Sequence, residues 1–166
     1  MMENTREKVA IVATALRQAG IVCHLFGGWA EEILGVRAPS THGDIDLLYC
    51  GEDFHVFDRV LRELLDFQEM PQKRFRHKRA FRFLGTVCEL TLVQGPEERP
   101  TTMFWGDVPY AWESPLLHGP LVEICGELIS VVSAANLGRY RENHKATQPH
   151  RWREPQALEP YARALR

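Results

Sequence analysis

The sequence has no apolar stretch close to the roughly 20 residues that a membrane-spanning helix needs. It also lacks a basic start followed by an apolar block, because its first ten residues include Glu3, Arg6 and Glu7. Of the 166 residues, 45% are apolar and 25% are charged, which is too apolar for a disordered chain and typical of a globular one. We therefore expect a cytoplasmic protein that contacts no membrane.

Paired cysteines and a strong net charge are missing as well. Cys23, Cys50, Cys88 and Cys125 stand apart and form no C-x-x-C pair that would indicate zinc or redox chemistry. Apart from Cys50 they lie in apolar runs, which favours small buried side chains in a reducing compartment over disulfides. The formal net charge of −2 provides no field over the whole protein that would attract nucleic acid. Such a contact would need a local basic patch.

Hydrophobic periodicity predicts that helices and strands are mixed along the chain. Helices are expected at residues 4–18, 29–34, 54–66, 134–145 and 154–165, and strands at 21–26, 44–50, 74–84, 86–93, 122–125 and 127–132. Thr5 or Asn4, Asp53 and Ser133 are candidate N-caps, while Gly85 and Gly126 are expected in hairpin turns. We expect an α+β fold with a short mixed sheet flanked by helices and a smaller C-terminal part made of a hairpin and helices.

An acidic pair stands out in the expected strand at 44–50. Strand alternation sends the carboxylates of Asp44 and Asp46 to one face, while Ile45 and Leu47 point to the other. At about 6.6 Å and an effective dielectric near 20, two negative charges repel by roughly 2.5 kcal/mol. Mg²⁺ is the natural cation to offset this repulsion, since it takes carboxylate oxygens and substrate phosphates as ligands. Alone, an acidic pair is also common on a solvated strand.

Two further features accompany this pair. Gly27 and Gly28 lie between an expected strand and an expected helix, where bare backbone can approach a phosphate, although an ordinary tight turn has the same pattern. Glu89 interrupts the apolar strand at 86–93. If that strand lies beside the one at 44–50, three carboxylates converge. Two metal ions roughly 3.5–4 Å apart could then serve a phosphoryl-type displacement.

Together these segments resemble a known family. The sequence is similar to the small antibiotic nucleotidyltransferases, the lincosamide and aminoglycoside adenylyltransferases of the polymerase-beta-like superfamily, in Gly27-Gly28-Trp29-Ala30, in His42-Gly43-Asp44-Ile45-Asp46-Leu47 and in Glu89. The resemblance covers residues 21–93. It implies the nucleotidyltransferase fold and an enzyme that uses Mg²⁺ to transfer a nucleoside monophosphate, AMP from ATP, to a hydroxyl of a small molecule.

The resemblance also implies roles for these residues. Asp44, Asp46 and Glu89 would be the catalytic residues and the ligands of two Mg²⁺ ions, and Glu89 would orient or deprotonate the acceptor hydroxyl. Gly27 and Gly28 would receive the nucleoside triphosphate on their backbone N–H groups.

The loop before the acidic pair carries further nucleotide-binding candidates, which are His42, Ser40 and Arg37. His42 would touch phosphate or steady its loop. Ser40 stands where relatives often have Arg or Lys, and Glu32 where they often have Asp. The missing cation weakens the expected contact with the triphosphate, and Arg37 or a later basic segment could replace it.

That basic segment, residues 73–82, holds six Lys or Arg and no acid. It predicts either a charged hairpin at a sheet edge or a site for phosphate or an acidic acceptor, with Phe75 and Phe81 as base-stacking platforms for RNA. If it lines the acceptor cleft, a polycationic aminoglycoside is not expected, and a neutral or anionic acceptor fits better.

Residues 104–121 follow no clear period. Their aromatic residues Trp105, Tyr110 and Trp112 would either wall a small-molecule pocket or fill a gap between subdomains. The loop at 96–100 is the candidate boundary between a nucleotidyltransferase core, 1–95, and a C-terminal part, 96–166, that packs on the core and faces the acceptor.

The leading hypothesis is thus a nucleotidyltransferase whose partners are a nucleoside triphosphate and a small hydroxyl-bearing acceptor. The alternative is a nucleotide-binding regulatory module or a catalytically lapsed relative, such as a toxin–antitoxin partner. The sequence leaves the acceptor, the nucleotide and the oligomeric state open.

Overall fold

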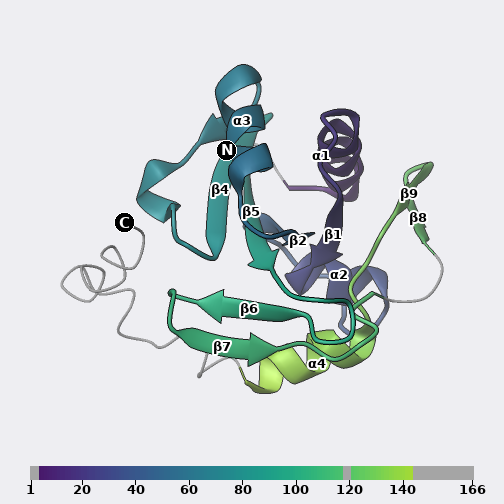
Figure 1. Ribbon diagram of the computed structural model, residues 1–166. Helices are drawn as coiled ribbons and strands as arrows, with labels where there is room; N and C mark the ends of the chain where they lie inside the picture. Colours follow the sequence, from purple (N-terminus) through teal and green to yellow (C-terminus); the bar gives the residue numbers. More distant parts are fainter. Residues whose placement is uncertain (1–3, 118–120, 144–166) are drawn as a thin grey trace.

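A five-stranded mixed sheet organises the protein (Figure 1). The structure, a computed structural model, describes residues 4–117 and 121–143. In chain order the elements are α1 (Arg6–Gln18), β1 (Cys23–Phe26), α2 (Gly27–Ile33), β2 (Asp44–Cys50), α3 (His55–Glu63), β3 (Gln68–Glu69), a 3₁₀ turn (Pro71–Lys73), β4 (Lys78–Phe83), β5 (Thr86–Val93), β6 (Thr101–Phe104), β7 (Val108–Ala111), β8 (Val122–Ile124), β9 (Glu127–Ile129) and α4 (Ala134–Glu142). The predicted α+β class is confirmed. The helix expected at 154–165 lies outside the described residues.

The sheet has the strand order β1-β2-β5-β4-β3. Its central pair, β2 and β5, is parallel, and the other pairs are antiparallel. Parallel pairing sets Asp46 directly opposite Glu89, and antiparallel pairing sets Phe26 opposite Asp46 on the other side. Directly paired residues share a sheet face, so this register decides which side chains meet.

Helix boundaries follow the predicted capping residues closely. The side chains of Thr5 and Ser133 accept hydrogen bonds from backbone N–H groups in the first turns of α1 and α4, as predicted. Asp53 accepts from the His55 N–H at 2.8 Å, although the N-cap of α3 is Phe54. Helix α3 ends at Glu63, earlier than expected, because the chain becomes extended at the next residue.

Each of three hairpin connections contains two successive residues with positive φ, the second of which is a glycine. Leu84-Gly85 and Cys125-Gly126 both have positive φ at each residue, which is the geometry of tight turns that match strand twist, so both predicted hairpins are confirmed. Trp105 and Gly106 also have positive φ, within the three-residue loop that joins β6 to β7. The sequence interpretation missed this third hairpin, since aromatic residues and prolines obscured its alternation.

The hydrophobic core lies on the sheet face turned toward α1 and α3. Leu25, Ile45, Leu47 and Leu90 are almost completely buried on this face. Figure 1 shows α1 and α3 on one side of the molecule and the β6–β7 hairpin with α4 on the other. The opposite face of β2 and β5 carries the acidic residues, and farther along the same strands Leu48 and Val93 are buried on that face.

Phe81 is a central packing residue of that core. Its side chain is fully buried, and its ring lies 5.5 Å from Phe57 and 5.4 Å from Phe67, between centroids. We expect Phe81→Ala to lower the free energy of unfolding by about 3–5 kcal/mol, because a cavity remains where the ring was. Urea unfolding measures this, with the half-exposed Val56→Ala as control. A loss no larger than that of the control would contradict the packing role.

The aromatic residues Trp105, Tyr110 and Trp112 are buried. The Trp112 ring stacks on Tyr140 of α4 at 5.5 Å, whereas the Trp105 ring packs on His77 at 4.7 Å. These contacts support the interpretation that the aromatic residues fill a gap between subdomains, rather than the alternative that they wall a small-molecule pocket. The expectation that Phe75 and Phe81 form stacking platforms for RNA is wrong, because both rings are buried in the protein.

All four cysteines are free. Cys88 is buried as expected, whereas Cys125 is exposed because it occupies a hairpin turn.

The boundary between a nucleotidyltransferase core, 1–95, and a C-terminal part, 96–166, stays a prediction. Among the described residues, no helix has the length and apolar character required to cross a membrane.

Candidate active site

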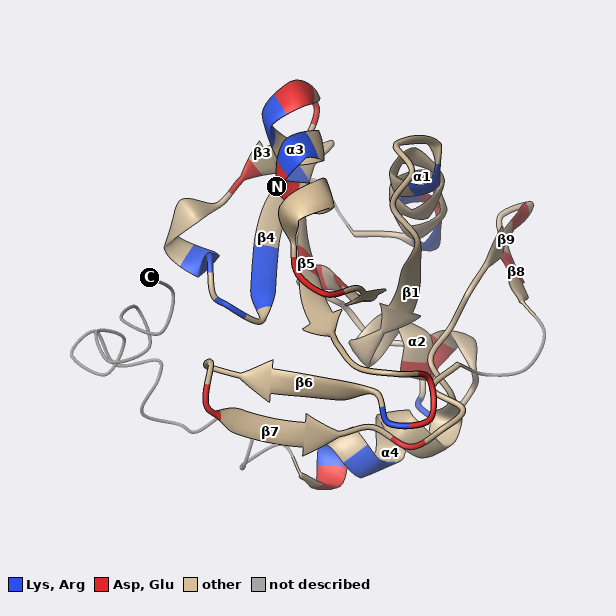
Figure 2. Ribbon diagram, in the orientation of Figure 1, with Lys and Arg blue, Asp and Glu red and all other residues tan. Residues whose placement is uncertain are grey.

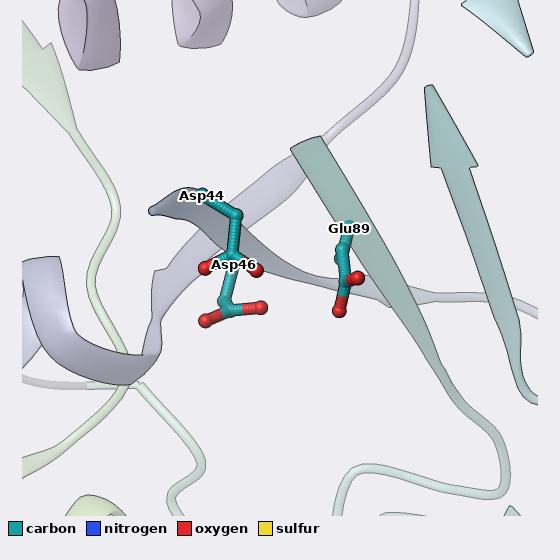
Figure 3. A group of neighbouring side chains, drawn as sticks. All are labelled: Asp44, Asp46 and Glu89. Carbon is teal, nitrogen blue, oxygen red and sulfur yellow. The ribbon is translucent and has the colours of Figure 1, made fainter. Parts of the chain in front are cut away.

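Three partly or fully buried carboxylates meet on one face of the central strand pair. Asp44 and Asp46 leave β2 on the same side, and Glu89 leaves β5 opposite Asp46. Figure 3 shows the three side chains pointing in one direction from the two strands. One oxygen from each lies within 4.8 Å of the others. The convergence predicted from the sequence is therefore present.

The charges of the two aspartates are poorly compensated. Burial raises the pKa of Asp46 to about 8, with the charges of Asp44 and Glu89 adding to the rise and Lys78 and Lys73 opposing it. Burial and the Glu89 charge likewise raise the pKa of Asp44. Within the described part of the chain, no Lys or Arg forms an ion pair with either aspartate. Hard oxygen ligands that lack a cationic partner fit a divalent cation such as Mg²⁺.

Glu89 differs from the aspartates, because two lysines hold it. The Lys73 and Lys78 ammonium groups each lie 2.6 Å from a different oxygen of Glu89. Burial alone would raise the pKa of Glu89, but the charge of Lys78 and the hydrogen bonds from both lysines outweigh burial and lower it. Burial would lower the pKa of Lys78, yet Glu89 raises it. Glu89 is thus an ionised carboxylate.

The two glycines border the acidic cluster closely. Gly27 has φ +70°, and a Cβ placed on it would lie 2.6 Å from Oδ2 of Asp46. A Cβ on Gly28 would lie 2.7 Å from Nδ1 of His42. Helix α2 begins at Gly27, two residues before the predicted start, so both glycines belong to its first turn. Only glycine allows this contact between the turn and Asp46.

Glu32 organises the loop that leads into β2. Its carboxylate accepts the backbone N–H of Ser40 at 3.0 Å and lies 3.3 Å from Nε2 of His42, and Arg6 contributes a longer hydrogen bond. Burial raises the pKa of Glu32, but these partners outweigh burial and lower it. His42 also packs on the Trp29 ring at 4.3 Å. The sequence left two roles open for His42, which are to touch phosphate or to steady its loop. These contacts agree with the second role.

Arg37 lies beside a different acid. Its guanidinium is 4.0 Å from Glu31, which also receives Arg141 of α4. The structure thus brings together Asp44, Asp46 and Glu89 with the glycine turn, whereas Arg37 pairs away from them. Whether Arg37, Ser40 and His42 contact a nucleotide stays a prediction.

The basic segment divides between the two faces of the sheet. Figure 2 shows basic residues at the beginning of β4 and just before it. Lys78 points to the acidic cluster, whereas Arg79 lies on the other face, where it binds Asp58 of α3 at 2.7 Å together with Arg74. The alternative of a solvated edge hairpin is therefore wrong for Lys78 and Arg79, whose side chains are mostly buried. Sequence reasoning missed the pairing of Lys73 and Lys78 with Glu89.

His77, between these basic residues, is buried and neutral. Its Nδ1 accepts the Trp105 backbone N–H at 3.1 Å. Burial lowers its pKa to about 3, with Lys78 adding to the fall and Glu89 opposing it. Because this value lies below the ordinary 6.5, the unfolded chain binds more protons between these pH values. The His77 contribution to stability is therefore lost as pH falls from 6.5 to about 3.

The variant His77→Asn tests this titration, because an Asn carbonyl can accept the same N–H. We expect the free energy of unfolding of wild type to fall more steeply with acidification than that of the variant. Urea unfolding at a series of pH values measures both slopes. Parallel slopes would show that His77 does not titrate in this way.

Comparison with known proteins identifies the fold. No family model and no curated protein matches the sequence. Among solved structures, lincosamide antibiotic adenylyltransferase LnuA, in its lincomycin-bound crystal structure, has a TM-score of 0.64 at 12% identity over 98% of both chains. The antibiotic-resistance factor ANT(2'')-Ia in solution has a TM-score of 0.63 at 16% identity, over 96% of this chain and 81% of that chain.

A crystal structure of ANT(2'')-Ia in complex with adenylyl-2''-tobramycin also matches, with a TM-score of 0.60 at 16% identity over 96% of this chain and 86% of that chain. The protein therefore has a nucleotidyltransferase fold. More closely, it is the fold of the small antibiotic nucleotidyltransferases, as the sequence resemblance predicted.

Proposed function

We propose that the protein is a Mg²⁺-dependent nucleotidyltransferase that transfers AMP from ATP to a hydroxyl of a small molecule. The observation that carries the proposal is the convergence of Asp44, Asp46 and Glu89 beside the turn at Gly27 and Gly28. The likeness in fold supports this class of reaction, because the similar structures include a protein described as an adenylyltransferase. Fold alone does not choose the acceptor, which depends on the side chains of the site.

In this proposal each group has a defined task. Asp44 and Asp46 would hold Mg²⁺, with Glu89 as a further ligand. The bound ion would supply charge neutralisation and polarisation of the α-phosphate. The first turn of α2, open because Gly27 and Gly28 carry no side chain, would receive the β- and γ-phosphates on its backbone N–H groups.

The transfer itself is a single in-line displacement. The acceptor hydroxyl oxygen forms a bond to the α-phosphorus, the bond from that phosphorus to the bridging oxygen breaks, and pyrophosphate leaves with the bonding electron pair. The hydroxyl proton passes to the Glu89 carboxylate, which the two lysines keep ionised. Positioning and charge neutralisation, rather than covalent catalysis, carry such a reaction.

Calorimetry with ATP, in the presence and absence of Mg²⁺, is the first test, followed by measurement of pyrophosphate release with a broad panel of hydroxyl compounds. We expect binding that requires Mg²⁺ and an acceptor whose mass rises by one AMP residue. Binding without pyrophosphate release over the panel would favour a nucleotide-binding module. Failure to bind ATP would remove the proposal.

A further inference from the structure

The positive charge at the acidic cluster comes from β4 and the turn before it. Lys78 is the first residue of β4, and Lys73 ends the 3₁₀ turn, so both reach Glu89 from the side of the sheet that lies beyond β5. The glycine turn follows β1, on the opposite side of β2. Three inter-strand spacings separate β1 from β4, or about 14 Å. The lysines and the glycines therefore flank the carboxylates from opposite sides.

In-line displacement assigns these two sides to different substrates. The entering hydroxyl and the leaving pyrophosphate lie on opposite sides of the α-phosphorus. If the β- and γ-phosphates occupy the glycine side, the acceptor approaches from the side of β4. It then meets the ammonium groups of Lys73 and Lys78 beside Glu89.

Both lysines are committed to Glu89 as the structure stands. Each oxygen of Glu89 has one ammonium at 2.6 Å, so a cation or the acceptor proton has to compete with a lysine at either oxygen. Freeing an oxygen leaves an ammonium without its partner, which is costly for Lys78 because only 13% of its side chain is exposed. A second anion in the same place would offset that cost. The side chain of Lys73, 40% exposed, is accessible to an incoming molecule.

From this arrangement, and resting on the proposed function, we propose that the acceptor carries a carboxylate or phosphate group near the hydroxyl that is modified, and that Lys73 and Lys78 bind this group. Among the described residues, the cations that contact the cluster are these two ammonium groups, and both lie on the side of β4. A cationic group of an acceptor would be repelled by them at close range. An anionic acceptor would be attracted and held by charge-assisted hydrogen bonds.

Matched pairs of compounds test the charge of the acceptor directly. The protein is first loaded with Mg²⁺ and a non-hydrolysable ATP analogue. Hydroxy acids are then titrated against their amides, sugar phosphates against the parent sugars, and an aminoglycoside is added as the cationic arm. Calorimetry reports affinity without requiring turnover. We expect the anionic member of at least one pair to bind about ten-fold or more tightly than its neutral partner.

Two lysine variants and one control locate the effect. Lys73→Gln is expected to remove the preference for the anion without weakening Mg²⁺-dependent binding of the ATP analogue, since it also releases one oxygen of Glu89 for the cation. Lys78→Arg keeps the charge at the buried position and is expected to retain the preference. Arg62→Gln removes an exposed positive charge from α3 and is expected to change neither affinity.

Three results would overturn the inference. The first is that charged and neutral members of every pair bind equally, or that neither binds. The second is that the preference for the anion persists in Lys73→Gln, and the third is that Lys73→Gln binds the ATP analogue more weakly, which would assign the lysine to the triphosphate. The relative strength of the carboxylate and phosphate arms tells which anion the site prefers. If wild type does not bind the ATP analogue at all, the proposed function fails and this inference fails with it.

Discussion

Asp46→Asn is expected to abolish nucleotidyl transfer while leaving the protein folded. Asp46 lies at the centre of the site, opposite Glu89 in the sheet and in contact with the turn at Gly27. Replacing one carboxylate oxygen by an NH₂ group removes a cation ligand without changing the size of the side chain. Loss of an outer partner of a metal ligand already costs about 10–100-fold, so kcat/KM should fall by more than about 100-fold for loss of the ligand itself.

The fold should tolerate this change because Asp46 is an unfavourable anion in the protein. Burial raises its pKa to about 8, with the charges of Asp44 and Glu89 adding to the rise. The free energy of unfolding therefore falls as pH rises from the ordinary pKa of 3.8 to about 8. The neutral amide avoids that cost, and the melting temperature of the variant should be equal to or above that of wild type. Mg²⁺-dependent binding of ATP should be lost.

Asp66→Asn serves as the matched control, since it removes an exposed carboxylate from the turn between α3 and β3. Its activity and melting temperature should match those of wild type. Comparable turnover by wild type and Asp46→Asn would take Asp46 out of the mechanism. A melted Asp46→Asn protein would show that the carboxylate is structural.

The carboxylate pair was predictable because strand alternation acts locally. Residues two apart on a strand share a face, so Asp44 and Asp46 had to point together once β2 formed. Glu89 is different, since its position depends on which strand lies beside β2 and in which register. Parallel pairing of β2 with β5 set that register, and the sequence could state it only as a condition.

The division of the basic segment was out of reach for the same reason. Its density of Lys and Arg was plain in the sequence, but the same alternation that joins Asp44 to Asp46 separates Lys78 from Arg79. One lysine meets Glu89 and the arginine meets Asp58 because different elements cover the two faces. Neither partner lies near the segment in the chain, so no local pattern could assign them.

The position of positive charge sets this site apart from the pattern implied by the family resemblance. At Ser40, where a cation was expected, the backbone N–H instead binds Glu32 and fixes the loop. Arg37 pairs with Glu31, outside the cluster. Among the described residues, the cations that reach the cluster are Lys73 and Lys78, on the far side from the glycine turn. Under the proposed function, this positive charge lies where the acceptor would enter and not where the triphosphate would bind.

Gly27→Ala is expected to impair the site more than Gly28→Ala, the same substitution at the other glycine of the turn. The new Cβ would lie 2.6 Å from Oδ2 and 3.0 Å from Cβ of Asp46, so the aspartate must move. Because the carboxylates must converge to hold a cation, Mg²⁺-dependent binding of ATP should weaken by about ten-fold or more, equivalent to about 1.4 kcal/mol or more. Calorimetry measures this loss directly.

A matched glycine separates this contact from backbone strain. Gly35 has φ +72°, close to the +70° of Gly27, but a Cβ on Gly35 would meet nothing within 4 Å. Both alanine variants should therefore share the cost of a left-handed backbone, about 1–2 kcal/mol of stability, whereas Gly27→Ala alone should lose Mg²⁺-dependent binding of ATP. If the two variants bind Mg²⁺ and ATP equally well, the contact between the turn and Asp46 does not shape the site. If both lose binding to the same extent, destabilisation of the fold explains the loss, because the variants share nothing else.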